Sequence, residues 1–221
     1  MRSFIKKITH PFLKSALDWY YSKPRKYCYG TSFVTVHPDV FPPHLTISTK
    51  LLLDFIQPKE IKGKSFLELG CGSGIISVYA AKKGAMVTAS DINETALEFL
   101  EKSAVANSIK ITIVNSDLFE KLNGQSFDYI IINPPYYPKT PKNIKEKAWF
   151  CGKDFEYFER LFLQLPEFLS DSNQTFMILS EDCQLEKIQS IALKNNIAFE
   201  LVQEKTVYAE KNYIYQLQLL N

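Results

Sequence analysis

The segment Asn133-Pro134-Pro135-Tyr136 follows the apolar run 129–132, which has the composition of a buried strand. Proline has no N–H for a sheet ladder, so the strand has to end there. An amide or nucleobase NH2 group is a poor nucleophile because its lone pair is delocalised into the adjoining π-system. If the Asn133 side-chain oxygen and the Pro134 carbonyl accept its two hydrogens, the lone pair is directed at an electrophile. Pro135 stiffens the backbone and Tyr136 can lie flat on a planar acceptor. These residues predict a site that positions a planar amino group.

A glycine-rich segment, residues 68–74, follows an earlier predicted strand and leads into a predicted helix. Glycines let the backbone approach a ligand closely, and the N–H groups of the helix start face that ligand. A dinucleotide fingerprint needs a sixth-place glycine counted from Gly70, but Ile75 stands there. The form E-x-G-x-G-x-G instead resembles motif I of S-adenosylmethionine-dependent methyltransferases. The residues expected to bind the cofactor here are Glu68, Gly70, Cys71, Gly72 and Gly74. We expect Cys71 to be a small packing residue within the loop and not a nucleophile.

Carboxylates stand at the ends of the next two predicted strands. Asp91, followed by Ile92, can accept hydrogen bonds from both hydroxyls of a ribose, or it can cap the following helix. Asp117 can accept from an adenine amino group, with Leu118 beside the ring, or it can form an Asx turn. Because four strands each end in an appropriate residue, we favour binding of an adenosine-containing cofactor over a purely structural role.

Strand and helix patterns alternate along most of the chain. This alternation predicts an α/β fold with helices on both faces of a mostly parallel seven-stranded sheet and an antiparallel C-terminal strand. Together with the resemblance to motif I, it implies the Rossmann-like methyltransferase fold. Ligands of such sheets lie beyond the carboxyl ends of the strands. Residues 30–43 indicate irregular structure or an edge hairpin. The expected strands are 64–70, 85–91, 110–117, 127–133, 174–180, 198–208 and 212–220, and the expected helices are 46–57, 73–84, 93–107, 154–170 and 184–196.

Composition indicates an ordinary globular chain of 221 residues, 46% hydrophobic and 23% charged, with a net charge of +2. We expect an N-terminal arm, residues 1–40, and one methyltransferase domain, residues 41–221. No stretch predicts a membrane span or a secretory signal, so we expect a cytoplasmic location and no membrane partner. The cysteines show no C-x-x-C pairing, and we therefore expect no metal site. They are Cys28, Cys71, Cys151 and Cys183.

The first 30 residues are basic and aromatic. The charged residues are Arg2, Lys6, Lys7, Lys14, Lys23, Arg25 and Lys26 against Asp18. The aromatic residues interleaved with them are Trp19, Tyr20, Tyr21, Tyr27 and Tyr29. Such a segment can bind phosphate and stack on bases. The interpretation we favour is a solvated basic helix that packs its aromatic rings on the domain.

With these motifs in view, the chain resembles the HemK-type glutamine N-methyltransferases, which modify peptide-chain release factors. Residues 40–56, 66–74 and 133–136 carry the resemblance, and 147–162 adds the more specific A-x-x-G-G-x-(D/N)-G-x-x-x-x-x-R stretch. The matching positions of that stretch are Ala148, Gly152, Asp154 and Arg160. Cys151 and Phe155 replace two of its glycines, and no acidic residue stands in 43–49.

The resemblance implies S-adenosyl-L-methionine as cofactor and an acceptor nitrogen in a planar group. Our first hypothesis is a protein glutamine amide, as in a release factor. The alternative is an adenine or guanine amino group of RNA or DNA, with the basic arm and four lysines as the nucleic-acid surface. These lysines are Lys139, Lys142, Lys145 and Lys147. A third hypothesis, a module that binds the cofactor without chemistry, is disfavoured by the intact Asn133.

Overall fold

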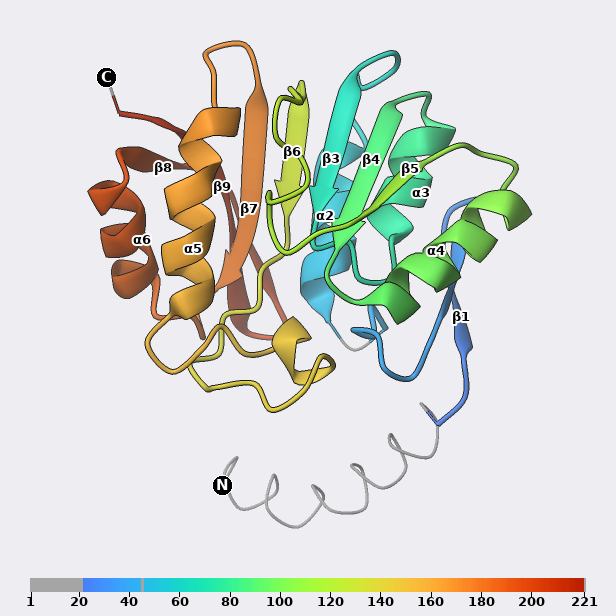
Figure 1. Ribbon diagram of the computed structural model, residues 1–221, viewed down its shortest axis with the longest axis horizontal. Helices are drawn as coiled ribbons and strands as arrows, with labels where there is room; N and C mark the ends of the chain where they lie inside the picture. Colours follow the sequence, from blue (N-terminus) through green and yellow to red (C-terminus); the bar gives the residue numbers. More distant parts are fainter. Residues whose placement is uncertain (1–21, 45, 221) are drawn as a thin grey trace.

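The computed structural model describes residues 22–44 and 46–220 and contains a twisted seven-stranded sheet (Figure 1). The strand order is β5-β4-β3-β6-β7-β9-β8, in which β9 alone runs antiparallel to the other six strands. This confirms the predicted fold class. The strands are β3 (Ser65–Leu69), β4 (Met86–Asp91), β5 (Thr112–Asn115), β6 (Tyr129–Ile132), β7 (Gln174–Ser180), β8 (Ile197–Val207) and β9 (Glu210–Leu219).

Helices cover both faces of the sheet, and the strand residues point alternately to the two sides. Phe66 joins one core cluster with α2 (Ile47–Ile56), α3 (Ile75–Lys82) and α4 (Glu94–Ala106). Leu67, its neighbour, joins a second cluster with α5 (Glu156–Gln164) and α6 (Leu185–Lys194). Burial on both faces explains why the central strands are almost continuously apolar.

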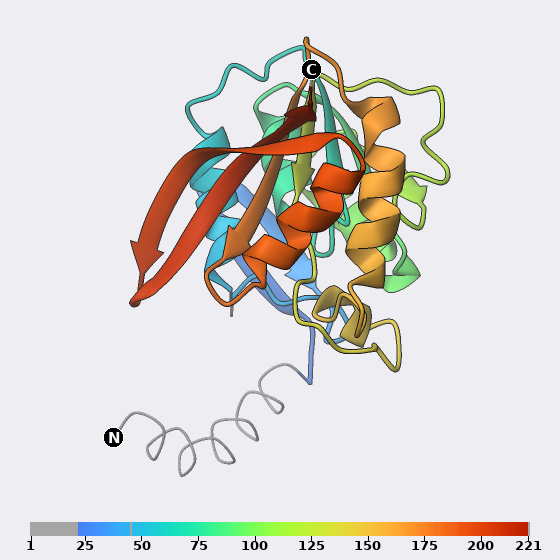
Figure 2. The same cartoon turned by 90° about the vertical axis from the view of Figure 1, so that its left-hand side faces the viewer.

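The last two strands form a long hairpin that extends beyond the helices (Figure 2). Its turn residues, Tyr208 and Ala209, both have positive φ, 51° and 64°. Positive φ at both positions gives the turn a twist that matches the strands it joins. The antiparallel pairings of the large sheet all involve β9, which the short turn joins to β8 and which pairs with β7 on its other side.

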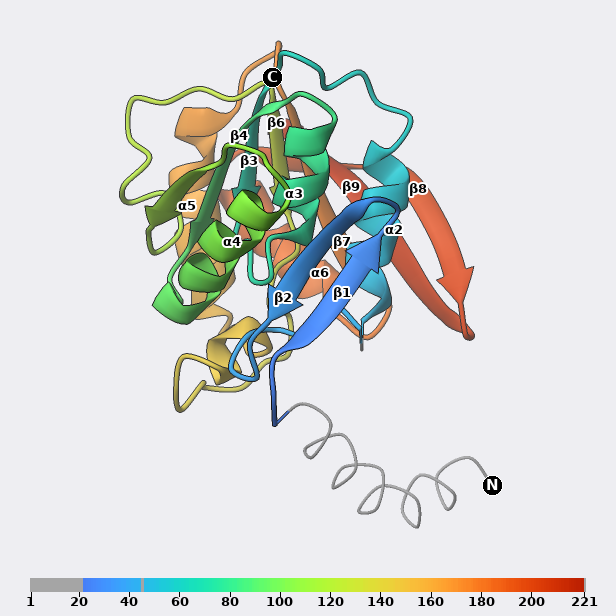
Figure 3. The same ribbon diagram turned by 90° about the vertical axis from the view of Figure 1, so that its right-hand side faces the viewer.

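A second, two-stranded sheet precedes the main one. Strands β1 (Arg25–Tyr29) and β2 (Ser32–Val36) pair in antiparallel register and lie against α3 and α4 (Figure 3). The Asn107 side-chain amide donates to the Phe33 carbonyl (2.7 Å), which ties β2 to the end of α4. The predicted hairpin is thus present, although its first strand begins earlier than the sequence pattern indicated. Residues 1–21 of the basic arm lie outside the described residues, and the predicted boundary at residue 40 stays a prediction.

The expected helix 154–170 is interrupted. Helix α5 ends at Gln164, and a 3-10 turn, η2 (Leu165–Phe168), replaces its continuation. Pro166 lacks the N–H that an α-helix would need there, so the single-helix expectation was wrong at its C-terminal part.

The sequence predicts neither a membrane-spanning helix nor a metal site. Within 22–44 and 46–220, no helix is both long and apolar enough to cross a bilayer. The same ranges contain no group of three or more His, Cys, Asp or Glu side chains placed to hold a metal ion. The cytoplasmic location stays a prediction.

Candidate active site

A pocket of about 320 Å³ lies at the carboxyl ends of β3, β4, β5 and β6, where the sequence placed the site. Twelve of the thirteen predicted site residues line it: Glu68, Gly70, Cys71, Gly72, Asp91, Ile92, Asp117, Leu118, Asn133, Pro134, Pro135 and Tyr136. Gly74 is the exception. The structure therefore brings the predicted residues together, while their individual roles stay predictions.

The glycine loop is shaped by backbone conformations that favour glycine. Gly70, Gly72 and Gly74 all have positive φ, at 72°, 50° and 69°. A Cβ at Gly74 would lie 2.4 Å from Leu100 Cδ1, so this glycine lets α3 approach α4 closely. Gly74 therefore serves packing, whereas a Cβ at Gly70 would meet no atom within 4 Å.

The N–H groups of this loop are largely used by the protein itself. Those of Gly70 and Cys71 both donate to the Ser90 carbonyl (2.9 Å each), and Gly74 donates to the Cys71 carbonyl (2.7 Å). Gly72 donates to Asp91 Oδ2 (2.7 Å). Four of the five N–H groups from 70 to 74 are thus engaged within the protein, whereas the expectation concerned the N–H groups at the start of α3 and stays a prediction.

Glu68 is a buried carboxyl group, 6% exposed, beneath the loop. Its Oε2 accepts hydrogen bonds from the backbone N–H (2.8 Å) and the hydroxyl of Ser77, in the first turns of α3. Burial raises the pKa of Glu68 to about 8, against the opposing effect of the Ser77 hydrogen bonds. Near neutral pH this group is therefore mostly protonated. Cys71, also buried, has its pKa raised by burial, so its thiol stays protonated and unreactive, in agreement with its predicted packing role.

Asp91 holds two backbone N–H groups at the end of β4. Besides Gly72, it accepts a bond from Asn93 N–H (2.8 Å), one bond on each carboxylate oxygen. Asn93 in turn caps α4 by accepting from Thr95 N–H (3.1 Å), so the helix cap falls to Asn93 and not to Asp91. Each Asp91 oxygen keeps a further acceptor site for a ligand hydroxyl.

Asp117 forms an ion pair with Arg160 of α5. One of its oxygens is thereby occupied, and the other remains for the predicted contact with an adenine amino group. The next residue, Leu118, is 7% exposed and has a positive φ of 51°. Arg160 lies in the family-like stretch of the sequence, where it had no assigned role.

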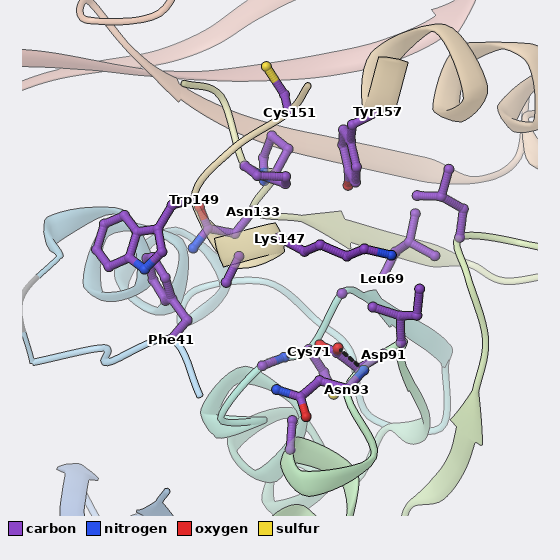
Figure 4. Close-up of a pocket in the computed structure, with 18 of the residues that line it drawn as sticks. Phe41, Leu69, Cys71, Asp91, Asn93, Asn133, Lys147, Trp149, Cys151 and Tyr157 are labelled. Carbon is purple, nitrogen blue, oxygen red and sulfur yellow. Dashed lines mark hydrogen bonds between the residues drawn. The ribbon is translucent and has the colours of Figure 1, made fainter. Parts of the chain in front are cut away.

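Asn133 reaches the pocket from the end of β6 (Figure 4). Its Nδ2 lies 3.5 Å from the hydroxyl of Thr49, a buried residue of α2 that accepts this long hydrogen bond. That contact leaves the Asn133 side-chain oxygen for a ligand. Tyr136 packs against Tyr137, with ring centroids 4.8 Å apart, and burial raises its pKa so that its hydroxyl stays neutral.

A segment that we call the flap, residues 137–152, covers one side of the pocket. The Tyr137 N–H donates to the Trp149 carbonyl (3.1 Å), and the Cys151 N–H donates to the Tyr137 carbonyl (3.0 Å). Trp149 packs against Phe41 at 4.6 Å between ring centroids, and Lys145 pairs with Asp39 at 3.5 Å. The flap is therefore held both to itself and to the segment before α2.

Sequence reasoning missed several pocket residues: Phe41, Thr49, Trp149 and Tyr157. None stands at the end of a predicted strand, which was the signal that identified the others. An aromatic residue before α2 and another in the flap meet only through the fold, so no spacing in the sequence reveals the pair.

Two positions in the family-like stretch explain its pattern. Gly152 has φ +93°, and a Cβ there would lie 1.9 Å from Glu156 Oε2. Phe155, which replaces a glycine of the pattern, also has positive φ, 65°, yet is 4% exposed in the second core cluster. Burial of its ring offsets a strained backbone that glycine would adopt without cost.

Comparisons with known proteins agree with this geometry. The model of the family "Methyltransferase small domain" matches residues 32–206. A Methanocaldococcus jannaschii protein named "Putative protein N5-glutamine methyltransferase" is 32% identical over 176 residues, 75% of this chain and 87% of its own length. The ribosomal RNA small subunit methyltransferase C of Haemophilus influenzae is 33% identical over 170 residues, 72% of this chain but 50% of its own length.

Solved structures share the fold. The Thermus thermophilus 16S rRNA N2 G1207 methyltransferase, in complex with AdoMet and guanosine, superposes with a TM-score of 0.64 at 19% identity, over 88% of this chain and 50% of its own. An E. cuniculi complex described as responsible for methylation of the eRF1 translation termination factor gives 0.62 at 21% identity, over 82% and 99%. This chain thus spans about half the length of the ribosomal RNA methyltransferases that it matches. The predicted resemblance is confirmed, and the chain belongs to the methyltransferase small-domain family.

Proposed function

We propose that the protein is an S-adenosylmethionine-dependent N-methyltransferase that acts on a planar amino group. The observation that carries this proposal is the meeting of Asn133 with the glycine loop and Asp91 in one pocket. The volume of the pocket is within the range of known small-molecule and cofactor sites, so the pocket is large enough for a ligand of this class. Asp91 offers acceptors for ribose hydroxyls, and the open side of Gly70 admits a close ligand.

The chain's own groups would orient the acceptor. The Asn133 side-chain oxygen and the Pro134 carbonyl accept the two hydrogens of the amino group, and the ring of Tyr136 covers its plane. Thr49 holds the Asn133 amide with its nitrogen turned away from the acceptor. When bound, the cofactor supplies an electrophilic methyl group on a sulfonium centre. Because the sulfonium charge disperses during transfer, positioning without a strong base is sufficient.

A protein glutamine amide is the first-choice acceptor. The relative with the glutamine name matches over 87% of its own length, whereas the ribosomal RNA relatives match over half of theirs. The stretch 147–162, which resembles the glutamine N-methyltransferases, also supports a glutamine acceptor. Its glycine at position 152 has a backbone conformation that favours glycine.

A guanine or adenine amino group of RNA is the second candidate. It is favoured by four exposed lysines of the flap beside the pocket, Lys139, Lys142, Lys145 and Lys147. A duplex would have to present its base unstacked, so single-stranded or loop RNA suits the site best.

The acceptor class is tested with radiolabelled S-adenosylmethionine and an extract from cells that lack the protein. Label released by protease supports the glutamine acceptor, and a mass shift of one methyl group on a glutamine-containing peptide then locates it. Label released by nuclease refutes that acceptor and supports RNA or DNA. Cofactor binding without transfer to any acceptor would refute the methyltransferase proposal itself.

A further inference from the structure

The pocket contains more acidic than basic side chains. Glu68, Asp91, Asp117 and Glu156 line it, against Lys147 and Arg160. Arg160 is paired with Asp117. Lys147 forms no ion pair or side-chain hydrogen bond within the described part of the chain, so it is the one basic group of the pocket without an anionic partner there.

Lys147 is directed into the pocket. Its side chain leaves the flap beside Asn133 and extends across the pocket towards Leu69, the last residue of β3 (Figure 4). The 3-10 turn η1 (Glu146–Ala148) fixes its backbone, because the Lys147 N–H donates to the Asn143 carbonyl (3.3 Å). The Phe41–Trp149 and Asp39–Lys145 contacts hold the flap on both sides of this residue. The backbone that carries the Lys147 side chain is therefore held in place by contacts within the flap and with the segment before α2.

The methionine part of the proposed cofactor carries a sulfonium, an ammonium and a carboxylate. The carboxylates of the pocket other than the protonated Glu68 suit the first two groups, but the carboxylate of the cofactor needs donors. A glycine loop often supplies such donors from its backbone. Here four of the five N–H groups from 70 to 74 already donate to Ser90, Cys71 and Asp91. Among the N–H groups of this loop, only that of Ser73 then remains for a carboxylate.

We propose that Lys147 binds the α-carboxylate of the methyl donor, an inference that rests on the proposed function. The ammonium reaches the end of β3, next to the loop that would hold the methionine part, and it brings the positive charge that the loop lacks. Lys147 is then a cofactor-binding residue supplied by the flap, and the contacts of the flap with Phe41 and Asp39 help to hold it in place.

The test is calorimetric binding of two probes, S-adenosylmethionine and its decarboxylated form, which lacks only the carboxylate. Lys147→Met removes the charge and keeps the chain length. We expect it to weaken binding of S-adenosylmethionine by about 10- to 100-fold, the range for loss of one hydrogen bond between charged groups. The decarboxylated probe should bind the variant no more weakly than the wild type, since the two changes remove the same contact.

Lys153→Met is the matched control, because this exposed lysine follows the flap and does not line the pocket. It should leave both dissociation constants unchanged. Wild-type affinity of Lys147→Met for S-adenosylmethionine would overturn the inference, and so would an equal loss for both probes. Lys147→Arg, which keeps the charge, should retain more affinity than Lys147→Met. If the wild type binds neither probe, the proposed function fails together with the inference, which separates that outcome from the others.

Discussion

Replacing the buried Glu68 by glutamine should change how the stability of the fold depends on pH. Glu68 is 6% exposed, and its pKa rises from 4.5 to about 8 because burial disfavours the charged form. Below the lower value the group is protonated in both the folded and the unfolded chain. Between the two values the unfolded chain releases the proton and the folded chain keeps it, so the free energy of unfolding falls as pH rises.

The size of this effect follows from the two pKa values. Each pH unit between them corresponds to about 1.4 kcal/mol. From pH 4.5 to pH 8 the loss attributable to Glu68 is therefore on the order of 5 kcal/mol, a large part of the stability of an ordinary domain. Above the folded pKa the group is ionised in both states and the slope ends. Glutamine keeps a side-chain oxygen that can accept from Ser77 but cannot ionise.

The assay is urea unfolding of the wild type and Glu68→Gln from about pH 5 to about pH 8. The difference in unfolding free energy between the two proteins should grow by about 1.4 kcal/mol per pH unit, in favour of the variant. Asp91, whose pKa burial also raises, contributes a slope of the same sign to both proteins and cancels in the difference. Glu60→Gln, on an exposed residue, is the control for loss of one negative charge. Parallel stability profiles for wild type and Glu68→Gln would refute the assignment of a raised pKa to Glu68.

Four further substitutions test the site and its support. Asn133→Ala should lower methyl transfer by about 100-fold or more, as expected for a lost orienting contact, while cofactor affinity measured by calorimetry stays near wild type; full turnover would contradict the role of Asn133. Gly74→Ala should cost about 2–4 kcal/mol in urea unfolding, because it combines a left-handed backbone with a close approach to Leu100. Gly70→Ala, with open space around its Cβ, should cost only the backbone part, about 1–2 kcal/mol, and equal losses would contradict the packing role of Gly74. Phe155→Gly should destabilise the fold by about 2–4 kcal/mol although it relieves the backbone; a stabilised variant in thermal unfolding would contradict the argument that burial keeps this phenylalanine.

The predictable part of the site is the part that strand ends supply. Parallel strands bring their carboxyl ends to one edge, so Asp91, Asp117 and Asn133 could be placed together from their positions after apolar runs. The hydrogen bonds formed by the neighbouring glycine loop were less predictable from the sequence. The N–H groups of Gly70 and Cys71 are taken by the Ser90 carbonyl, because the strand-to-helix turn closes on β4, and no spacing in the sequence indicates this.

The flap was beyond sequence reasoning for a physical reason. It has no hydrophobic period of 2 or 3.6, and it is held by backbone hydrogen bonds between Tyr137 and Trp149 together with one aromatic contact to Phe41. Neither kind of contact leaves a spacing signal, since the partner of Trp149 lies more than a hundred residues earlier in the chain. Phe155 shows the same limit, because its left-handed backbone depends on a core that only the fold assembles.

The division between strand ends and flap separates two functional tasks. The strand ends fix groups that any planar amino acceptor needs, with Asn133 held by Thr49 at the centre. The flap presents Trp149, Ile144 and its lysines to whatever approaches that centre. If Lys147 binds the methyl donor as proposed, an acceptor that displaces the flap would loosen that donor. On this proposal, we expect productive acceptors to leave the flap in place, a requirement that the proposed glutamine side chain meets more easily than a bulky nucleotide.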